Sequence, residues 1–239
     1  MQKVLSFVRR AVDDYHMIED GDRIAIGVSG GKDSVTLALA LAALRRFYPK
    51  KFEIVPITLA MGFADMDFSP LKAYFKNAGM ELLVQDTNIA EILFDIRKEK
   101  NPCSLCAKLR RGALHDAALE NGCNKVALGH HNDDVLETFI LSLFYEGRIH
   151  SFSPVTYLDR KKLHLIRPMI YMNEQDVIGF INRSGATVIH NPCPANGYTK
   201  RQYAKELLAS LSRENRGLKE RMFTALTASL ENWRKDALK

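Results

Sequence analysis

A run of six residues, SGGKDS at positions 29–34, has the composition of a phosphate-binding loop. It follows an apolar, strand-like run at positions 24–28 and opens an Ala- and Leu-rich stretch with helical spacing. Glycines allow backbone N–H groups to approach phosphate oxygens closely, and a helix N-terminus adds free N–H donors and a favourable dipole. Lys32 and the two serines add side-chain donors. The run therefore predicts a loop that binds phosphate.

Two common nucleotide-binding motifs do not fit this loop. The pattern GxxxxGK[ST] would need Gly at position 26 and Ser or Thr at position 33, but the chain has Ile26 and Asp33. The pattern GxGxxG has no match in the sequence. The loop therefore indicates a different use of ATP.

A second polar run, GHHNDD at positions 129–134, follows another predicted strand. Asp133 and Asp134 lie at a strand end and helix start, where paired carboxylates can hold Mg²⁺ against phosphate oxygens. Their simpler role is N-capping of the helix, although capping accounts for one aspartate more readily than for two plus Glu137. His130 and His131 are as readily structural residues as ligands.

Three of the four cysteines have a spacing that suits a metal site. Cys103 and Cys106 form a CxxC pair at a predicted helix start, and Cys193 lies between two prolines. Three thiolates suit an iron–sulfur cluster in which one iron has no protein ligand. A structural zinc site usually completes four ligands with a second CxxC or a His pair, and neither is evident in the sequence. A redox dithiol is the remaining alternative. Cys123 is expected to be a small buried hydrophobe.

The elements that must position these residues alternate between short β-branched runs and helical stretches, which predicts a parallel sheet with helices on both faces. Five strands are expected, at positions 23–28, 52–59, 81–85, 125–128 and 163–166. Helices are expected at positions 34–47, 69–78, 104–121, 133–145 and 173–182. The fold class is thus α/β and Rossmann-like, with residues 1–198 as one domain that includes an N-terminal helix. Residues 199–239 form a C-terminal helical extension that is not an independent domain.

Composition and charge narrow the class of protein further. The 239 residues are 46% hydrophobic and 26% charged, which is typical of a globular domain. The longest apolar run is too short for a membrane span, and no signal-peptide pattern begins the chain, so we expect a soluble cytoplasmic protein. The tail from Thr199 to Lys239 carries five of the six net positive charges. That tail is either a solvated helix surface or a face that meets nucleic-acid phosphates.

The motifs together resemble those of the PP-loop ATP pyrophosphatase superfamily and, within it, the tRNA 2-thiocytidine synthetase family. The resemblance rests on SGGKDS, PCSLC, GHHNDDVLET, PCP and the run LHLIRP at positions 163–168, and it covers most of the chain. It implies a sheet of the adenine nucleotide alpha hydrolase type and cleavage of ATP between its α and β phosphates. It also implies 4Fe-4S-dependent transfer of sulfur to a cytidine in the tRNA anticodon loop.

The same resemblance suggests a role for each matching residue. The expected nucleotide-binding residues are Ser29, Gly30, Gly31, Lys32, Asp33, Ser34, Gly129 and His130. The expected catalytic residues are Lys32, Asp33, Asp133 and Asp134, the aspartates being candidates for Mg²⁺, and the expected cluster ligands are Cys103, Cys106 and Cys193. Arg110 and Arg111 either reach nucleotide or RNA phosphates or form a solvated helix face.

The implied partners are tRNA and a sulfur donor, either a cysteine desulfurase or sulfide, with a homodimer possible and no membrane. Three alternatives stay open. The chain could modify another tRNA pyrimidine, or act as a lysidine-synthetase-like ligase, which has no need of three placed cysteines. It could also be a zinc-stabilised RNA-binding module without turnover, which would release no pyrophosphate.

Overall fold

The computed structural model describes residues 1–63, 66–98, 102–189, 193 and 200–233. Its sheet has six strands in the order β3-β2-β1-β4-β6-β5. The strands are β1 (Asp22–Gly27), β2 (Phe52–Ala60), β3 (Leu83–Asp86), β4 (Lys125–Ala127), β5 (Val155–Leu158) and β6 (Leu163–Ile166). The α-helices are α1 (Gln2–Asp14), α2 (Lys32–Leu44), α3 (Ser69–Asn77), α4 (Pro102–Glu120), α5 (Asn132–Leu141), α6 (Glu174–Ser184), α7 (Lys200–Glu214) and α8 (Leu218–Ser229). Shorter helical segments are η1 (Glu91–Ile96), η2 (Ser142–Glu146) and η3 (Glu231–Trp233).

Strands β1 and β4 lie side by side at the centre of the sheet, although a long stretch of chain separates them. From β1 the chain moves outward to β2 and β3 on one side, and from β4 it continues to β6 on the other. The strand order therefore reverses between β1 and β4. In open parallel sheets, ligands bind at the carboxyl ends of the strands on either side of such a switch point.

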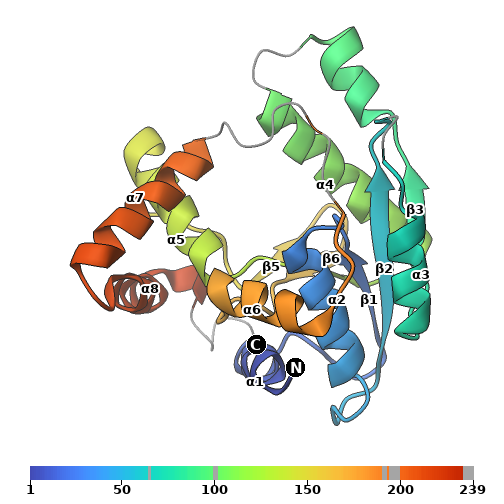
Figure 1. Cartoon of the computed structure of the whole chain (residues 1–239), viewed down its shortest axis with the longest axis horizontal. Coiled ribbons are helices and arrows are strands. Elements are labelled where there is room, and N and C mark those ends of the chain that lie inside the picture. The colour runs from blue at the N-terminus through green and yellow to red at the C-terminus, as the bar shows by residue number, and fades with distance from the viewer. Residues whose placement is uncertain (64–65, 99–101, 190–192, 194–199, 234–239) are drawn as a thin grey trace.

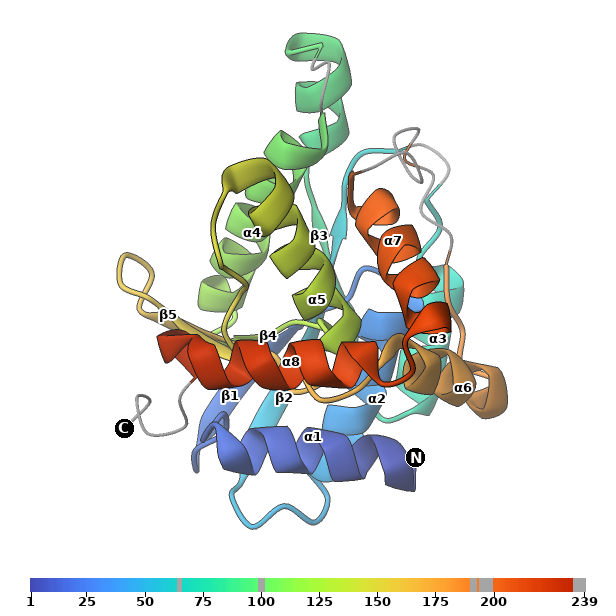
Figure 2. The same ribbon diagram turned by 90° about the vertical axis from the view of Figure 1, so that its left-hand side faces the viewer.

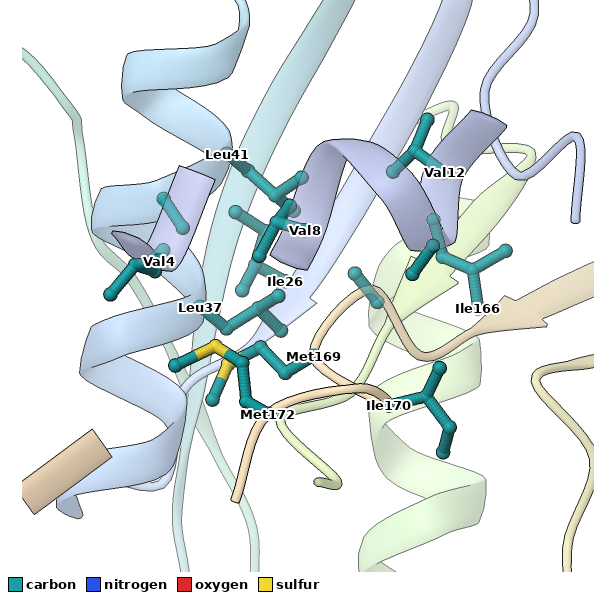
Figure 3. Close-up of a cluster of buried hydrophobic side chains, with 14 of the residues drawn as sticks. Val4, Val8, Val12, Ile26, Leu37, Leu41, Ile166, Met169, Ile170 and Met172 are labelled. Carbon is teal, nitrogen blue, oxygen red and sulfur yellow. The ribbon is translucent and has the colours of Figure 1, made fainter. Parts of the chain in front are cut away.

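The helices cover both faces of the sheet, as predicted. On one face, α1 presents Val4, Val8 and Val12 to α2 and to the turn that follows β6, within one large apolar core (Figure 3). On the other face, α4 packs its Leu114, Ala117 and Ala118 against β1, β2 and β4. Each central strand is thus buried on both sides, which is typical of parallel sheets.

The predicted count of five strands is one too low. The missing strand, β5, is an edge strand that pairs antiparallel with β6. Its four side chains are partly or largely exposed at the edge of the sheet, so the segment lacks the buried run that marks the central strands β1 and β2. The predicted helix over 133–145 also differs, because α5 ends at Leu141 and continues as the π-helical turn η2. The predicted domain boundary between residues 198 and 199 lies outside the described residues.

Helices α7 and α8 pack on α5, and Figure 2 shows α8 lying across it. Ala204, Leu208, Leu226 and Trp233 bury their side chains in the large core, so the tail shares the core of the sheet domain. Among the described helices, none has the length and apolar character needed to cross a membrane.

Asp133 joins three of these helices. Its Oδ2 accepts a hydrogen bond from the backbone N–H of Glu174 at 2.7 Å, at the start of α6. Its Oδ1 pairs with Lys219 Nζ of α8 at 2.6 Å. Burial pushes the pKa of Asp133 up, but the contacts with Lys219 and Glu174 outweigh it, and the pKa lies below its usual value of 3.8. A charged Asp133 therefore stabilises the junction of α5, α6 and α8.

We expect Lys219→Met to lower the free energy of unfolding by about 1–2 kcal/mol at pH 7, since it leaves a buried carboxylate short of a partner. Chemical denaturation measures this. The depressed pKa of Asp133 adds stability above pH 3.8, so the deficit should shrink as the pH falls below that value. The control is Lys161→Met, which breaks a surface pair with Asp116 whose side chains are 42% and 53% exposed. Equal losses from both variants would contradict the role given to Asp133.

Candidate active site

The SGGKDS run forms the turn between β1 and α2, as predicted. Gly30 has a φ of +84°, a conformation that favours glycine. Ser34 Oγ donates to the carbonyl of Gly31 at 2.9 Å and accepts from the backbone N–H of Ser29 at 3.1 Å. α2 then begins at Lys32, with Gly31 as its N-cap. The loop thus places a helix N-terminus at the carboxyl end of β1, where an anion is favoured.

The GHHNDD run lies directly against this loop because β4 neighbours β1. A Cβ on Gly129 would lie only 3.0 Å from the backbone carbonyl atoms of Asp33. His131 is the N-cap of α5, and its backbone N–H donates to Asp134 Oδ2 at 2.9 Å. Asp134 therefore takes part in capping, which the sequence left open, and Asp133 holds α6 and α8. Both aspartates also have fold roles.

One cavity, of about 380 Å³, brings together six of the predicted site residues: Lys32, Asp33, Cys103, Cys106, Asp134 and Cys193. α4 lies on one side of it, and α5 and α7 lie on the other (Figure 1). The polar residues that line it are Lys32, Asp33, Cys103, Cys106, Arg110, His131, Asp134, Glu137, Glu174, Cys193, Arg201, Gln202 and Lys205. Residues of the phosphate loop and the three cysteines therefore line the same cavity, although they come from three distant parts of the chain.

A second cavity, of about 600 Å³, opens at the carboxyl ends of β1, β2, β4 and β6. Ser29 and Gly31 of the phosphate loop lie in its wall, as do apolar residues such as Ile57, Leu59 and Leu114. A chamber that combines these apolar side chains with Arg110, Arg111, Arg167 and the phosphate loop suits a nucleotide. Met61, Ala107 and Arg110 line both cavities, so the two chambers adjoin.

The CxxC pair lies in the first two turns of α4, with Cys103 exposed and Cys106 half-buried. Burial raises the pKa of the Cys106 thiol, and the nearby thiols of Cys193 and Cys103 raise it further, while Arg110 opposes the shift. In the part of the chain that the structure describes, no three Cys, His, Asp or Glu side chains converge closely enough to hold a metal ion. The three thiols thus share a cavity without yet meeting at one point. The flanking Pro192 and Pro194 lie outside the described residues.

Cys123 does not line this cavity. It is buried with Leu114 and Val126 on the α4 face of the sheet, as expected for a small hydrophobe. Burial raises the pKa of its thiol.

Basic residues of the C-terminal tail pair with the carboxylates of the site. Arg201 Nη1 lies 3.1 Å from Glu137 Oε2 and 3.4 Å from Asp134 Oδ1, and Lys205 Nζ lies 2.7 Å from Glu174 Oε1. With Lys219 on Asp133, three tail cations face inward. Their side chains remain 35–45% exposed, so these ion pairs come in addition to the two expectations for the tail, a solvated surface or a nucleic-acid face, which stay predictions. Sequence analysis missed the ion pairs because each pair joins residues far apart in the chain.

Lys32 is held between two carboxylates, since its Nζ lies 3.0 Å from Asp33 Oδ1 and 3.2 Å from Glu174 Oε1. Burial lowers the pKa of Lys32, but these carboxylates outweigh it and raise the pKa above its usual value. Burial raises the pKa of Glu137, with Asp134 adding to the shift and Arg201 opposing it. The site thus pairs a fixed cation with an acidic wall, which can bind phosphate together with a metal cation.

The segment that leads to Cys193 rests on the phosphate loop. The backbone N–H of Ile189 donates to the carbonyl of Gly30 at 3.0 Å. A Cβ on Gly30 would come within 2.1 Å of Ile189 Cγ1. Ile189 precedes Cys193 by four positions, so the phosphate loop anchors the chain near the third thiol.

Comparisons with known proteins agree with this geometry. A family model described as the PP-loop domain matches residues 3–209. The tRNA-cytidine(32) 2-sulfurtransferase of Geobacter metallireducens is 39% identical over 228 residues, covering 94% of this chain and 89% of that protein. The protein of the same name from Coxiella burnetii is 38% identical over 236 residues, covering 95% and 89%.

A solved structure, the U34-tRNA thiolase NcsA from Methanococcus maripaludis with its [4Fe-4S] cluster, is 22% identical with a TM-score of 0.75. It covers 95% of this chain and 79% of that one, and it shows the same fold. Fold and site together define a PP-loop domain protein of the α/β class. Within that class, the chain belongs to the family of the tRNA-cytidine(32) 2-sulfurtransferases, which confirms the resemblance found in the sequence.

Gly30→Ala should lower the free energy of unfolding by at least about 1–2 kcal/mol, because it strains the backbone and drives a methyl group into Ile189. Denaturant titration measures the loss. Gly31→Ala is the matched control, since its φ is −77° and its new Cβ would meet only Ser29 Oγ, at 3.6 Å. Ile189→Ala should partly rescue Gly30→Ala. Strictly additive effects would show that the two residues do not press on each other.

His130 should make stability depend on pH. Burial lowers its pKa to about 3, with Arg167, Arg201 and His131 adding to the shift, from an ordinary value of 6.5. Only the unfolded chain takes up this proton between pH 6.5 and 3, so stability falls as the pH drops through that window, by up to about 1.4 kcal/mol per pH unit. His130→Gln should flatten this slope in denaturation curves recorded across the window. A slope that the variant leaves unchanged would refute the assignment.

Proposed function

We propose that this chain is an ATP-dependent tRNA sulfurtransferase, which adenylates the C2 oxygen of a cytidine in the tRNA anticodon loop and replaces that oxygen with sulfur. The observation that carries the proposal is the smaller cavity, which is lined both by Lys32 and Asp33 of the phosphate loop and by the three cysteines. Membership of the family supports it, and the name of the relatives points to cytidine 32 as the position.

ATP binds, in this proposal, with its triphosphate on the loop from Ser29 to Ser34 and its nucleoside in the larger cavity. Lys32 offsets the charge of the departing pyrophosphate, since its ammonium group is held at the start of α2. Asp33 and Asp134 line the smaller cavity and suit Mg²⁺. Asp133 has both oxygens engaged by Lys219 and Glu174, which supports a positioning role for that residue.

The donor set fits a 4Fe-4S cluster. Cys103, Cys106 and Cys193 are soft thiolate ligands around one cavity, and three of them leave one iron of such a cluster without a protein ligand. When bound, the cluster supplies that iron as the place where the sulfur to be transferred is held. Arg110 touches Cys106 and lines both chambers, so it keeps a positive charge between the thiols and the nucleotide.

Two displacements then follow. The C2 oxygen attacks the α-phosphorus of ATP and pyrophosphate leaves, which turns a poor leaving group into the oxygen of AMP. A hydrosulfide ion attacks C2, the C2–O bond breaks so that AMP departs with that oxygen, and the sulfur loses its proton to solvent, which leaves 2-thiocytidine. The residues of the cavity contribute mainly by holding the reacting groups in position beside fixed charges.

The finer parts of the proposal concern partners and location. The substrate is tRNA, the sulfur comes from a cysteine desulfurase or from sulfide, the chain forms a homodimer, and the protein works in the cytoplasm. Residues 1–198 act as the catalytic α/β domain. Residues 199–239 extend that domain, with α7 completing the acidic wall of the cavity.

The cysteines provide the direct test. Cells that lack the gene are complemented with the wild type or with Cys103→Ala, Cys106→Ala or Cys193→Ala, and tRNA nucleosides are quantified by mass spectrometry. We expect each variant to lose 2-thiocytidine at least about 100-fold, because an incomplete ligand set cannot hold the cluster. Anaerobically purified variants should also lose visible absorbance.

Cys123→Ala is the matched control and should keep the wild-type level of 2-thiocytidine. Unchanged 2-thiocytidine in the three ligand variants would reject cluster-dependent sulfur transfer. Pyrophosphate release that depends on tRNA but yields a lysine adduct would favour the ligase alternative, and tRNA binding without pyrophosphate release would favour the RNA-binding module.

A further inference from the structure

Arg167 is a buried cation that the proposed mechanism does not use. It follows β6 at the carboxyl edge of the sheet, is only 6% exposed, and lines the larger cavity. Its Nη1 donates to the carbonyl of Ser153 at 2.6 Å and to Thr156 Oγ1 at 3.2 Å. The guanidinium lies 4.9 Å from the ring centroid of Phe152. All of these partners are neutral, and buried Nε has no hydrogen-bond partner among the described residues.

A second buried cation shows the usual arrangement. Lys125 is 7% exposed and lies at the amino end of the central strand β4, where its Nζ is 2.7 Å from Asp22 Oδ2. Buried charges are normally paired in this way, because an unpaired charge in a poorly solvated site is costly. Within the described ranges, no carboxylate pairs with Arg167, and burial alone lowers its pKa to about 10. Arg167 therefore stays charged at neutral pH and lacks a counterion.

The surroundings of Arg167 indicate where a counterion would lie. The larger cavity also contains Ser29 and Gly31 of the phosphate loop and His130 of the neighbouring strand end. The ring of His130 lies 4.9 Å from that of Phe152, tilted by 38°, and its low pKa leaves it neutral. Its buried Nδ1 is a second polar atom with no hydrogen-bond partner among the described residues. Carboxylates of the site line the smaller cavity instead. An anion in the larger cavity thus meets Arg167 without competition from these acids.

We propose that Arg167 binds a phosphate group in the larger cavity, on the β4–β6 side of the phosphate loop. This inference rests on the function proposed above. The phosphate is either the α-phosphate of the bound nucleotide or a backbone phosphate of the RNA that carries the cytidine. The planar guanidinium suits either, because its parallel N–H groups match phosphate oxygens. The phosphate loop binds the β- and γ-phosphates, which depart as pyrophosphate, so Arg167 is free to bind the α-phosphate.

The test compares ligands that differ by one phosphate. Calorimetry measures the affinity of the full chain for AMP, adenosine, inorganic pyrophosphate and unmodified tRNA. For Arg167→Gln we expect AMP affinity to fall about tenfold or more, while adenosine and pyrophosphate affinities stay within about twofold of wild type, since a charged hydrogen bond is lost only where the α-phosphate is present. A loss confined to tRNA would assign the phosphate to the RNA chain.

Thr156→Val is the matched control, because it removes a fold contact of the same guanidinium and leaves its charge in place. It should keep the ratio of AMP to adenosine affinity. If Arg167→Gln does not fold, Arg167→Lys is used instead. It keeps the positive charge but not the paired N–H groups of the guanidinium, so AMP affinity should fall by a smaller factor. Wild-type ratios and tRNA affinity in both Arg167 variants would overturn the inference. If Arg167→Gln lowers AMP affinity but the wild-type enzyme makes no 2-thiocytidine, the phosphate-binding role of Arg167 holds and the proposed function is rejected.

Discussion

The contact between Gly129 and the start of α2 is the constraint on which the site depends. Because β1 and β4 are neighbours, the turn after β4 approaches the turn after β1 so closely that a methyl group on Gly129 would meet the Asp33 backbone. Two polar runs far apart in the chain thereby become one surface at the switch point of the sheet. The approach also brings His131 to within 3.6 Å of Asp33 Oδ1.

Charge balance is the second organising feature. The acidic wall formed by Asp134, Glu137 and Glu174 is offset by Lys32 from the phosphate loop and by Arg201 and Lys205 from α7. Half-buried carboxylates without such partners would be strongly destabilising. Helix α7 therefore does more than cover the core, because its Arg201 and Lys205 line the smaller cavity together with residues of α2, α4 and α5.

The two cavities give the chemistry a direction. Nucleotide-sized space lies over the strand ends, thiols lie in the adjoining chamber, and Met61, Ala107 and Arg110 form the boundary between them. The hydrogen bond from Ile189 to Gly30 ties the third thiol's segment to the loop that would hold the triphosphate. A backbone contact and the packing of Ile189 on Gly30 thus hold the segment before Cys193 against the phosphate loop.

Much of this could be read from the sequence, because the informative signals are local. The SGGKDS turn, the CxxC pair and the five predicted strands are signalled by neighbouring residues, and so is the alternation that indicates an α/β fold. Edge strand β5 lacked such a signal because its four residues are partly exposed. What only the tertiary structure decided are relations between distant residues. The partners of Asp133, the inward-facing cations of the tail, the seat of Ile189 on Gly30 and the unpaired Arg167 all follow from how the strands are ordered and how the helices pack, and no local pattern encodes either.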